Sequence, residues 1–305
     1  MIASSDQTEQ FRAAILAAGL TPPDEIQDGG ELHRFSTGNR RGDKSGWYVM
    51  HTDGIAAGTF GCWRAGLHST WCSKSDSAMT AAERDAHRQR IKDMRAKREA
   101  AESARQQDEA DKASDRWHSA STPCRHLYLE RKGVQAHRIR QHGDVLLIPL
   151  RDTAGTLHSL QTITPDGDKR FRGRMRGCYH AIGGKPKGRI VICEGYATGA
   201  SIHEATGEAV AVAFNAGNLM SVATALHRAH PDLVLLLAAD DDHLTPGNPG
   251  LSAARNAALA VGGFVVVPRF PSGRLDKATD FNDLAALVGL GAVCACFAEI
   301  LEAVC

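Results

Sequence analysis

Two short apolar runs, each ending at acidic residues, constrain the fold more than any other feature of the chain. The first run is Ile190–Cys193, which stops at Glu194, and the second is Leu233–Ala239, which stops at Asp240. Both runs are continuous rather than alternating, which is typical of strands buried on both faces of a parallel sheet. Ligands of such sheets bind beyond the carboxyl ends of the strands, so we expect Glu194 and Asp240 to lie at the functional edge.

The spacing of the acidic residues indicates which of them can act together. If the segment after the second run stays extended, Asp240 and Asp242 point the same way and Asp241 points the opposite way. Glu194, from the neighbouring strand, would face that pair, and three unpaired carboxylates so close together would resist ionisation. A hard divalent cation relieves this repulsion, and Mg²⁺ takes one or two carboxylates together with water and phosphate oxygens. We therefore expect one or two ions of Mg²⁺ or Mn²⁺.

The order of these segments resembles a known domain. A strand ending in Glu-Gly, then a helix, then a strand ending in Asp-x-Asp resembles the Toprim domain of bacterial-type primases, type IA and II topoisomerases and some nucleases. Longer strings are similar to the primases of conjugative plasmids and satellite phages, and they cover residues 120–290. These strings are Glu194–Gly199, Asn215–Asn218, Ala239–Asp242, Asn248–Gly250 and Asp280–Asp283.

The resemblance implies a fold and an activity. The fold class is α/β, with a Toprim-type parallel sheet and flanking helices, preceded by a small mixed or antiparallel N-terminal module and a long charged helix. The activity is that of a DNA primase, a DNA-directed RNA polymerase that makes short RNA primers on single-stranded DNA by two-metal nucleotidyl transfer. Glu194, Asp240 and Asp242 are the implied catalytic residues and metal ligands, and Asp280 is a further implied ligand. A different role for Asp280 and Asp283 is capping a helix that starts before Leu284.

A basic stretch precedes the first acidic strand. By the resemblance, its residues bind the nucleotide phosphates, with Lys169 as the leading candidate and Arg172, Arg174 and Arg176 next. Arginine suits bidentate binding of phosphate. The alternative is a basic loop that is merely solvated. Tyr196, in the Glu194–Gly199 string, could be either a core residue or a nucleotide contact.

The chain divides into four segments by composition: residues 1–75, 76–120, 121–188 and 189–305. The first is a small module with a helix at Thr8–Gly19 and strands at Leu32–Phe35, Gly46–His51 and Gly58–Trp63. The third begins the catalytic core, with strands at Val145–Leu150 and Leu157–Ile163, and the fourth is the Toprim domain, with a C-terminal helix at Gly291–Cys305.

The first segment combines aromatic and basic residues, which favours engagement of a single-stranded template. The candidate template contacts are Arg34, Arg41, Lys44, Trp47, Trp63 and Arg64, with Tyr48 and Phe60 as further stacking faces. The alternative is that the aromatic residues simply form the core of a small domain. Zinc is not expected here, because structural zinc sites use closely spaced ligand pairs and the eight cysteines include no CxxC pair.

The second segment predicts one long helix, from Met79 to Trp117 with Ser77 as a possible cap, because it is rich in Ala, Glu, Arg, Lys and Gln. Its few apolar residues give no wide core-facing stripe, so we expect a solvated spacer held by charge pairs four residues apart. An alternative is that its more basic first half also touches a nucleic-acid backbone.

Composition and motifs give expectations about the partners and the location of the protein. The net charge is +1, so any nucleic-acid footprint must be local. No apolar run reaches the roughly 18–20 residues of a membrane helix, and no signal peptide is evident at the N-terminus. We expect reduced cysteines, a cytoplasmic location and no membrane partner. No GxxxxGK[ST] string occurs, so no helicase motor is recognisable, and a replicative helicase would be a separate partner.

Three functions are compatible with these residues. The first is the primase, serving plasmid or phage replication with single-stranded DNA and ribonucleoside triphosphates as partners and acting as a monomer. The second is a Toprim nuclease or phosphodiesterase, in which the same metals would activate water. The third is a non-catalytic nucleic-acid-binding replication adaptor, against which the retained Glu194, Asp240 and Asp242 argue.

Overall fold

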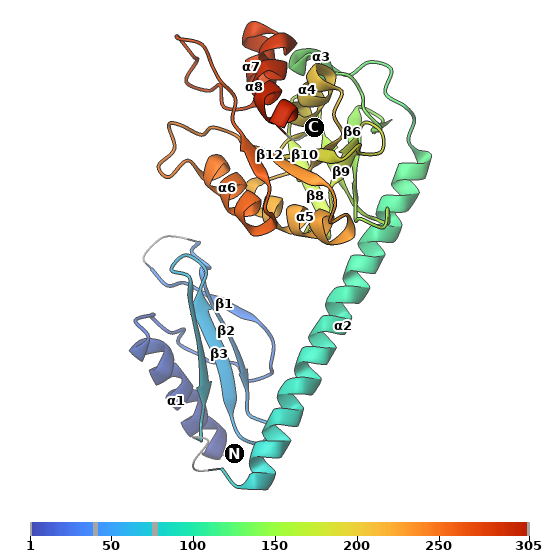
Figure 1. Cartoon of the computed structure of the whole chain (residues 1–305). Coiled ribbons are helices and arrows are strands. Elements are labelled where there is room, and N and C mark those ends of the chain that lie inside the picture. Colours follow the sequence, from blue (N-terminus) through green and yellow to red (C-terminus); the bar gives the residue numbers. More distant parts are fainter. Residues whose placement is uncertain (1, 39–41, 75–78, 304–305) are drawn as a thin grey trace. The chain divides into compact units, whose positions relative to one another are not determined.

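The computed structural model describes residues 2–38, 42–74 and 79–303 (Figure 1). The chain forms two compact units, Met1–Ala100 and Ala101–Cys305. The long helix α2 (Ala81–Ser119) begins in the first unit and ends in the second. None of the helices in the described ranges is both long and apolar enough to cross a bilayer.

The N-terminal unit is a helix packed on an antiparallel sheet. Helix α1 (Ile2–Ala17) covers a sheet of four strands in the order β1-β2-β3-β4. The strands are β1 (His33–Phe35), β2 (Gly46–His51), β3 (Ala57–Cys62) and β4 (Leu67–Cys72). Phe11 is fully buried between helix and sheet, and it fits because Gly58 has no side chain: a Cβ there would lie 2.6 Å from the Phe11 ring. Strand β4 was not expected from the sequence.

Helix α2 follows the expected course closely, starting and ending two residues later than predicted. Thr80 and Glu83 cap it reciprocally: the Thr80 N–H donates to Glu83 Oε2 (2.8 Å), and the Glu83 N–H donates to Thr80 Oγ1 (3.3 Å). The proposed cap Ser77 lies outside the described residues. Only Ala110 and Ala113 are buried along the helix, and charge pairs such as Lys112–Asp108 line its exposed faces. The expectation of a solvated helix is confirmed.

The second unit begins with a short helix and an antiparallel sheet. Helix α3 (Leu127–Lys132) is followed by strands β5 (Arg140–His142), β6 (Val145–Arg151), β7 (Leu157–Ile163) and β8 (Lys169–Gly173), paired in that order. One face of this sheet, including Leu146 and Ile148, joins the main core, while Leu147 and Leu160 on the other face pack against Ala113 of α2. Strand β5 was not expected from the sequence.

Residues 180–266 contain a five-stranded sheet in the order β13-β12-β10-β11-β9. The strands are β9 (His180–Ile182), β10 (Arg189–Cys193), β11 (Val210–Val212), β12 (Val234–Ala238) and β13 (Phe264–Val266). The last four are parallel, and β9 pairs antiparallel with β11 at one edge. The continuous apolar runs are therefore the two central parallel strands, as predicted.

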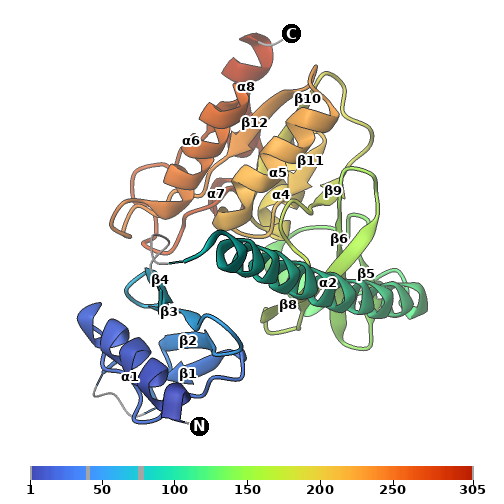
Figure 2. The same ribbon diagram turned by 90° about the horizontal axis from the view of Figure 1, so that it is seen from below.

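Helices cover both faces of this sheet (Figures 1 and 2). Helices α4 (Tyr196–Thr206), α7 (Phe281–Val288) and α8 (Leu290–Ala303) share one core with it, and α5 (Ala216–Ala229) and α6 (Pro249–Val261) share the other. Helix α4 lies very close to the strands because Gly199 has no side chain. A Cβ there would lie 2.8 Å from Val212 and 3.0 Å from the Cys193 sulfur.

One boundary differs from the sequence prediction in a way that matters for the site. From the sequence, we expect a loop at the Asn215–Asn218 string and a helix that starts at Met220. Instead, α5 starts at Ala216, because the Asn215 side chain accepts the Asn218 N–H (3.0 Å) and caps the helix. The first turn of α5 therefore lies beside the end of β10.

Candidate active site

The predicted acidic residues meet at the carboxyl edge of the parallel sheet. Strands β10 and β12 pair in parallel, with Ile192 opposite Leu237, so Glu194 and Asp240 leave adjacent strands at the same edge. Asp280, far along the chain, joins them from the start of α7, where its Oδ2 accepts a hydrogen bond from Thr198 Oγ1 of α4 (2.9 Å). The structure thus brings residues from three separate segments to one place.

The gathered carboxylates disfavour one another's ionisation. Burial, followed by the charges of Glu194, Asp280 and Asp242, raises the pKa of Asp240 to about 9. Burial and the charge of Asp242 raise the pKa of Glu194 to about 7, against a lowering contribution from the Ala216 backbone N–H. The pKa of Asp280 is also raised, by burial and by Asp283. This edge of the sheet is therefore built to receive positive charge.

Two carboxylate oxygens at this edge have no partner within the protein. Glu194 Oε1 and Asp240 Oδ1 are both buried and make no hydrogen bond. Such orphaned acceptors are costly unless something else satisfies them, and a bound cation would do so. Within the described ranges, no three His, Cys, Asp or Glu side chains are arranged to enclose a metal by themselves. This donor set fits Mg²⁺, which completes its octahedron with water and substrate phosphates.

Asp241 faces away from the other acidic residues, as the extended spacing predicted. Its Oδ2 accepts from Arg274 Nη1 (2.5 Å) and its Oδ1 accepts from Asn248 Nδ2 (2.6 Å). Asp242 has a different environment, because its Oδ2 accepts the backbone N–H of Gly250 (3.0 Å) at the start of α6. The alternation within the triplet therefore separates one structural aspartate from the two candidate ligands.

Helix capping and site formation coincide at Asp280. Its Oδ1 accepts the Asp283 N–H (2.8 Å), while Asp283 accepts the backbone N–H groups of Thr279 (2.9 Å) and Asp280 (3.4 Å). This reciprocal capping was one of the two roles left open by the sequence. The cap also fixes Asp280 beside Thr198 and near Asp240, so capping does not exclude a role at the site.

Lys169 begins strand β8 on the side of the acidic cluster. Its side chain is exposed to solvent, yet desolvation by the surrounding protein, and then the charge of Lys132, lower its pKa, against raising contributions from Asp280 and Asp240. Its neighbour Lys132 lies 3.9 Å from Asp283 Oδ1. Lys169 therefore lies within the electrostatic influence of Asp280 and Asp240.

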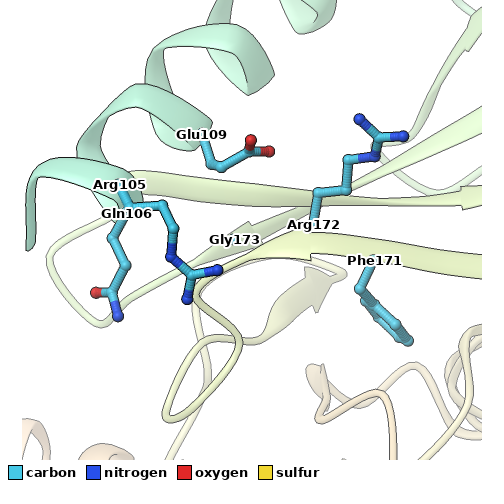
Figure 3. A pocket seen from close by; sticks show the side chains of 6 residues that line it. All are labelled: Arg105, Gln106, Glu109, Phe171, Arg172 and Gly173. Carbon is cyan, nitrogen blue, oxygen red and sulfur yellow. The ribbon is translucent and has the colours of Figure 1, made fainter. Parts of the chain in front are cut away.

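The other basic candidates are not all at the same place. Arg172 and Phe171 project to opposite sides of β8 (Figure 3), and Phe171 packs edge-to-face on Phe214. Arg172 lines a hollow of about 310 Å³. The residues around that hollow are Arg105, Gln106, Glu109, Phe171, Arg172 and Gly173. The strand alternation thus separates Arg172 from Lys169, although the resemblance to primases had grouped them as phosphate contacts.

Arg174 and Arg176 lie in the loop after β8, and both side chains are exposed. Asn218, which the sequence had not singled out as a site residue, holds this loop in place. It is 3% exposed, and its Nδ2 donates to the carbonyl oxygens of Ala213 (2.9 Å), Cys178 (3.0 Å) and Met175 (3.2 Å). The only sequence feature that pointed to a role for Asn218 was its place in the Asn215–Asn218 string.

Tyr196 is a core residue rather than a nucleotide contact. It is 1% exposed, and its hydroxyl donates to the Gln135 carbonyl (2.8 Å) and accepts the His137 N–H (2.7 Å). Both polar capabilities of the hydroxyl are therefore used within the protein.

The aromatic residues of the N-terminal unit divide between two faces of its sheet. Tyr48 and Phe60 are 3% and 2% exposed and belong to the core, so the expectation that they offer stacking faces is wrong. Trp63 is 62% exposed and lies 5.5 Å from Trp47, measured between ring centroids. Pairing across the strands places Arg34, Trp47, Gly61 and His68 in one row on this outer face.

The remaining template candidates are exposed or lie outside the described residues. Lys44 is exposed, and Arg64 is exposed while paired with Asp43 (Nη2 to Oδ1, 2.8 Å). Arg41 lies outside the described residues.

Comparison with known proteins shows what this chain is similar to. Residues 189–290 match the Toprim domain family. The chain is 38% identical over 285 residues to a DNA primase TraC of Escherichia coli, covering 87% of this chain and 27% of that protein. A second DNA primase TraC of Escherichia coli is 35% identical over 287 residues, covering 86% of this chain and 19% of that protein. The chain thus spans about a quarter or less of the length of these relatives.

A solved structure of the DnaG primase catalytic domain bound to single-stranded DNA is also similar, with a TM-score of 0.44 and 12% identity over 66% of this chain and 80% of that one. These values are too low to support a functional argument. The sequence relationships are stronger, and they place Glu194, Asp240, Asp242 and Asp280 inside the matched domain. Residues 189–290 therefore match the Toprim domain family, and most of the chain is similar to part of the DNA primases TraC.

Proposed function

We propose that this chain is a DNA primase that makes short RNA primers on single-stranded DNA by divalent-cation-dependent nucleotidyl transfer. One observation carries the proposal most directly. Glu194 and Asp240 each bury an unsatisfied carboxylate oxygen at the carboxyl edge of a parallel sheet, where burial and neighbouring charges raise both pKa values. The relationship to the TraC primases indicates which reaction such a cation site serves.

The acidic residues would hold Mg²⁺ or Mn²⁺, with Asp240 and Asp242 as ligands and Glu194 as a ligand or as the general acid/base. When bound, one or two such ions neutralise the triphosphate, lower the pKa of the attacking 3′-hydroxyl and stabilise the leaving pyrophosphate. Asp280 is an outer candidate, because its Oδ1 and Oδ2 are already engaged by Asp283 and Thr198. Asp280 would then contribute mainly its negative charge to cation binding.

Phosphate binding is assigned to Lys169, Arg174 and Arg176. All three are exposed, and none of them makes an ion pair within the described part of the chain, so their charges are available to a ligand. Lys169 is the primary phosphate contact because the charges of Asp280 and Asp240 influence its pKa, which indicates that it lies near the acidic cluster. Arg172 is left out of this set because it projects to the other face of β8.

The N-terminal unit is proposed to engage the template through the outer face of its sheet. Trp47 and Trp63 offer stacking surfaces for unpaired bases, and Arg34, Lys44 and Arg64 supply phosphate contacts, with Arg41 as a further candidate. The close packing of Trp47 over Gly61 on this face supports the assignment. A Cβ on Gly61 would lie 2.9 Å from the Trp47 ring, so only glycine leaves room for the indole.

The partners follow from the activity. We propose single-stranded DNA and ribonucleoside triphosphates as ligands, a replicative helicase as a separate partner, monomeric behaviour, and a role in plasmid or phage replication.

Primer synthesis tests the proposal. The purified chain is incubated with single-stranded DNA, labelled ribonucleoside triphosphates and Mg²⁺ or Mn²⁺, and products are resolved by size. We expect short RNA products that disappear in Asp240→Asn and Asp242→Asn, because each substitution keeps the shape and removes a ligand charge. Asp232→Asn is the matched control: it removes the same charge from an exposed position before strand β12, and it should retain activity.

The same experiment separates the competing functions. Degradation of the template without nucleotides, lost in the same two variants, would replace the primase with a nuclease. If template binding occurs but neither primers nor cleavage products form under any cation, the chain is a nucleic-acid-binding adaptor.

A further inference from the structure

Arg274 lies in the segment between β13 and α7, and each nitrogen of its guanidinium donates a hydrogen bond within the protein. Its Nη1 donates to Asp241 Oδ2 (2.5 Å), its Nη2 to the Asp241 carbonyl (2.6 Å) and its Nε to the Ala278 carbonyl (2.7 Å). The guanidinium also lies over the Phe270 ring, 4.2 Å from its centroid. The side chain of Arg274 is only 16% exposed. These contacts fix the guanidinium in one orientation.

This geometry disfavours direct phosphate binding by Arg274. An arginine that binds a phosphate presents its fork of donors to the ligand, whereas the nitrogen donors of Arg274 point at three protein oxygens. Lys169 and Arg174, by contrast, are exposed. Arg274 therefore contacts protein groups, whereas Lys169 and Arg174 face solvent.

The contacts of Arg274 connect two acidic segments that are distant in sequence. Asp241 lies between the candidate ligands Asp240 and Asp242, and Ala278 lies two residues before Asp280. A backbone hydrogen bond from the Asp241 N–H to the Thr279 carbonyl (2.8 Å) joins the same two segments. One guanidinium thus fixes the distance between the Asp240–Asp242 turn and the loop that carries Asp280.

We propose that Arg274 is a positioning residue, which holds the Asp240–Asp242 turn and the Asp280 loop at the separation that divalent-cation binding requires. The inference rests on the proposed function, in which these acidic residues bind the cation. Groups that orient metal ligands without touching the metal typically change metal affinity by about 10–100-fold. The planar fork of arginine is required, since a lysine ammonium cannot reach one carboxylate oxygen and two carbonyl oxygens in this arrangement.

Calorimetric titration of the full chain with Mn²⁺ alone tests the inference without relying on activity. We expect Arg274→Gln and Arg274→Lys each to weaken Mn²⁺ binding by at least about tenfold. Asp241→Asn should weaken it as well, and the double variant Asp241→Asn/Arg274→Gln should be no worse than the weaker single variant, because both changes break one contact. Arg255→Gln, which removes the same charge from an exposed position on α6, should bind Mn²⁺ like the wild type.

The outcomes separate this inference from the proposed function. Mn²⁺ affinity within twofold of the wild type in a folded Arg274→Gln variant overturns the positioning role, as does a wild-type chain that binds no Mn²⁺. If Arg274→Gln does not fold, Asp241→Asn carries the test alone, since it keeps the shape of the contact and should still lose affinity. A wild-type chain that binds Mn²⁺ but makes no primers refutes the primase, while the affinity losses would still support Arg274.

Discussion

Replacing Asn218 with aspartate should destabilise the protein strongly, although the substitution changes the size of the side chain very little. The two side chains have the same shape, so packing is preserved. The change turns the amide nitrogen, which donates to the Ala213, Cys178 and Met175 carbonyl oxygens, into an oxygen that can only accept. The Gly177 N–H keeps its acceptor, because Asn218 Oδ1 (2.9 Å away) is retained.

The magnitude follows from these contacts. The two amide hydrogens are lost, each hydrogen bond contributing roughly 1 kcal/mol, and buried carbonyl oxygens are left facing a carboxylate, with a further penalty of about 1–3 kcal/mol. We expect the free energy of unfolding at pH 7 to fall by about 3–5 kcal/mol. Burial raises the pKa of the new carboxyl, so the deficit should shrink as the pH falls and the carboxyl takes up a proton that can donate once.

Urea denaturation of the wild type and of Asn218→Asp at pH 7 and pH 5 measures this prediction. Asn256→Asp introduces the same charge at an exposed position of α6 and should change the stability by less than about 0.5 kcal/mol. A loss below about 1 kcal/mol in Asn218→Asp at pH 7 would refute the hydrogen-bond argument, and so would a deficit that grows at lower pH.

Two further predictions concern other parts of the molecule. His180 is 1% exposed, and burial lowers its pKa from 6.5 to about 4, so its contribution to stability is fully present above pH 6.5 and is lost as the pH falls toward 4. Denaturation curves should show that, from pH 7 to pH 5, the wild type loses about 2 kcal/mol more stability than His180→Gln does, and equal losses would contradict the assignment. Trp63→Ala should weaken binding of an unstructured oligonucleotide by at least about fivefold in fluorescence anisotropy at fixed salt, because one stacking face is removed. Leu32→Ala, which truncates a 55% exposed side chain of the same unit, should bind like the wild type, and similar affinities for all three proteins would remove Trp63 from the template surface.

The central strands and the acidic residues at their ends were predictable because their signals are local. A strand buried on both faces must be apolar at every position, and the run must stop where the sheet edge begins, so Ile190–Cys193 and Leu233–Ala239 identified both the strands and the edge. Strands β4, β5 and β9 gave no such signal. They lie at or near sheet edges, and β5 and β9 are only three residues long. Pairing with a neighbouring strand, rather than their own composition, determines them.

The sequence by itself determined which chemical groups this protein places at the ends of its central strands. The apolar runs identify the strands, and Glu194, Asp240 and Asp242 follow those runs directly in the sequence. Only the tertiary structure decided the state and surroundings of those groups. It placed Arg172 on the opposite face of β8 from Lys169, since their paired residues Leu160 and Ile163 lie in different cores. It also buried Tyr48 and Phe60 and gave Asp280 two roles. It also brought Arg274 to Asp241 across more than thirty positions of the chain. The burial of a side chain, its pKa and its hydrogen-bond partners all depend on groups from distant segments of the chain. A local sequence pattern therefore does not encode them.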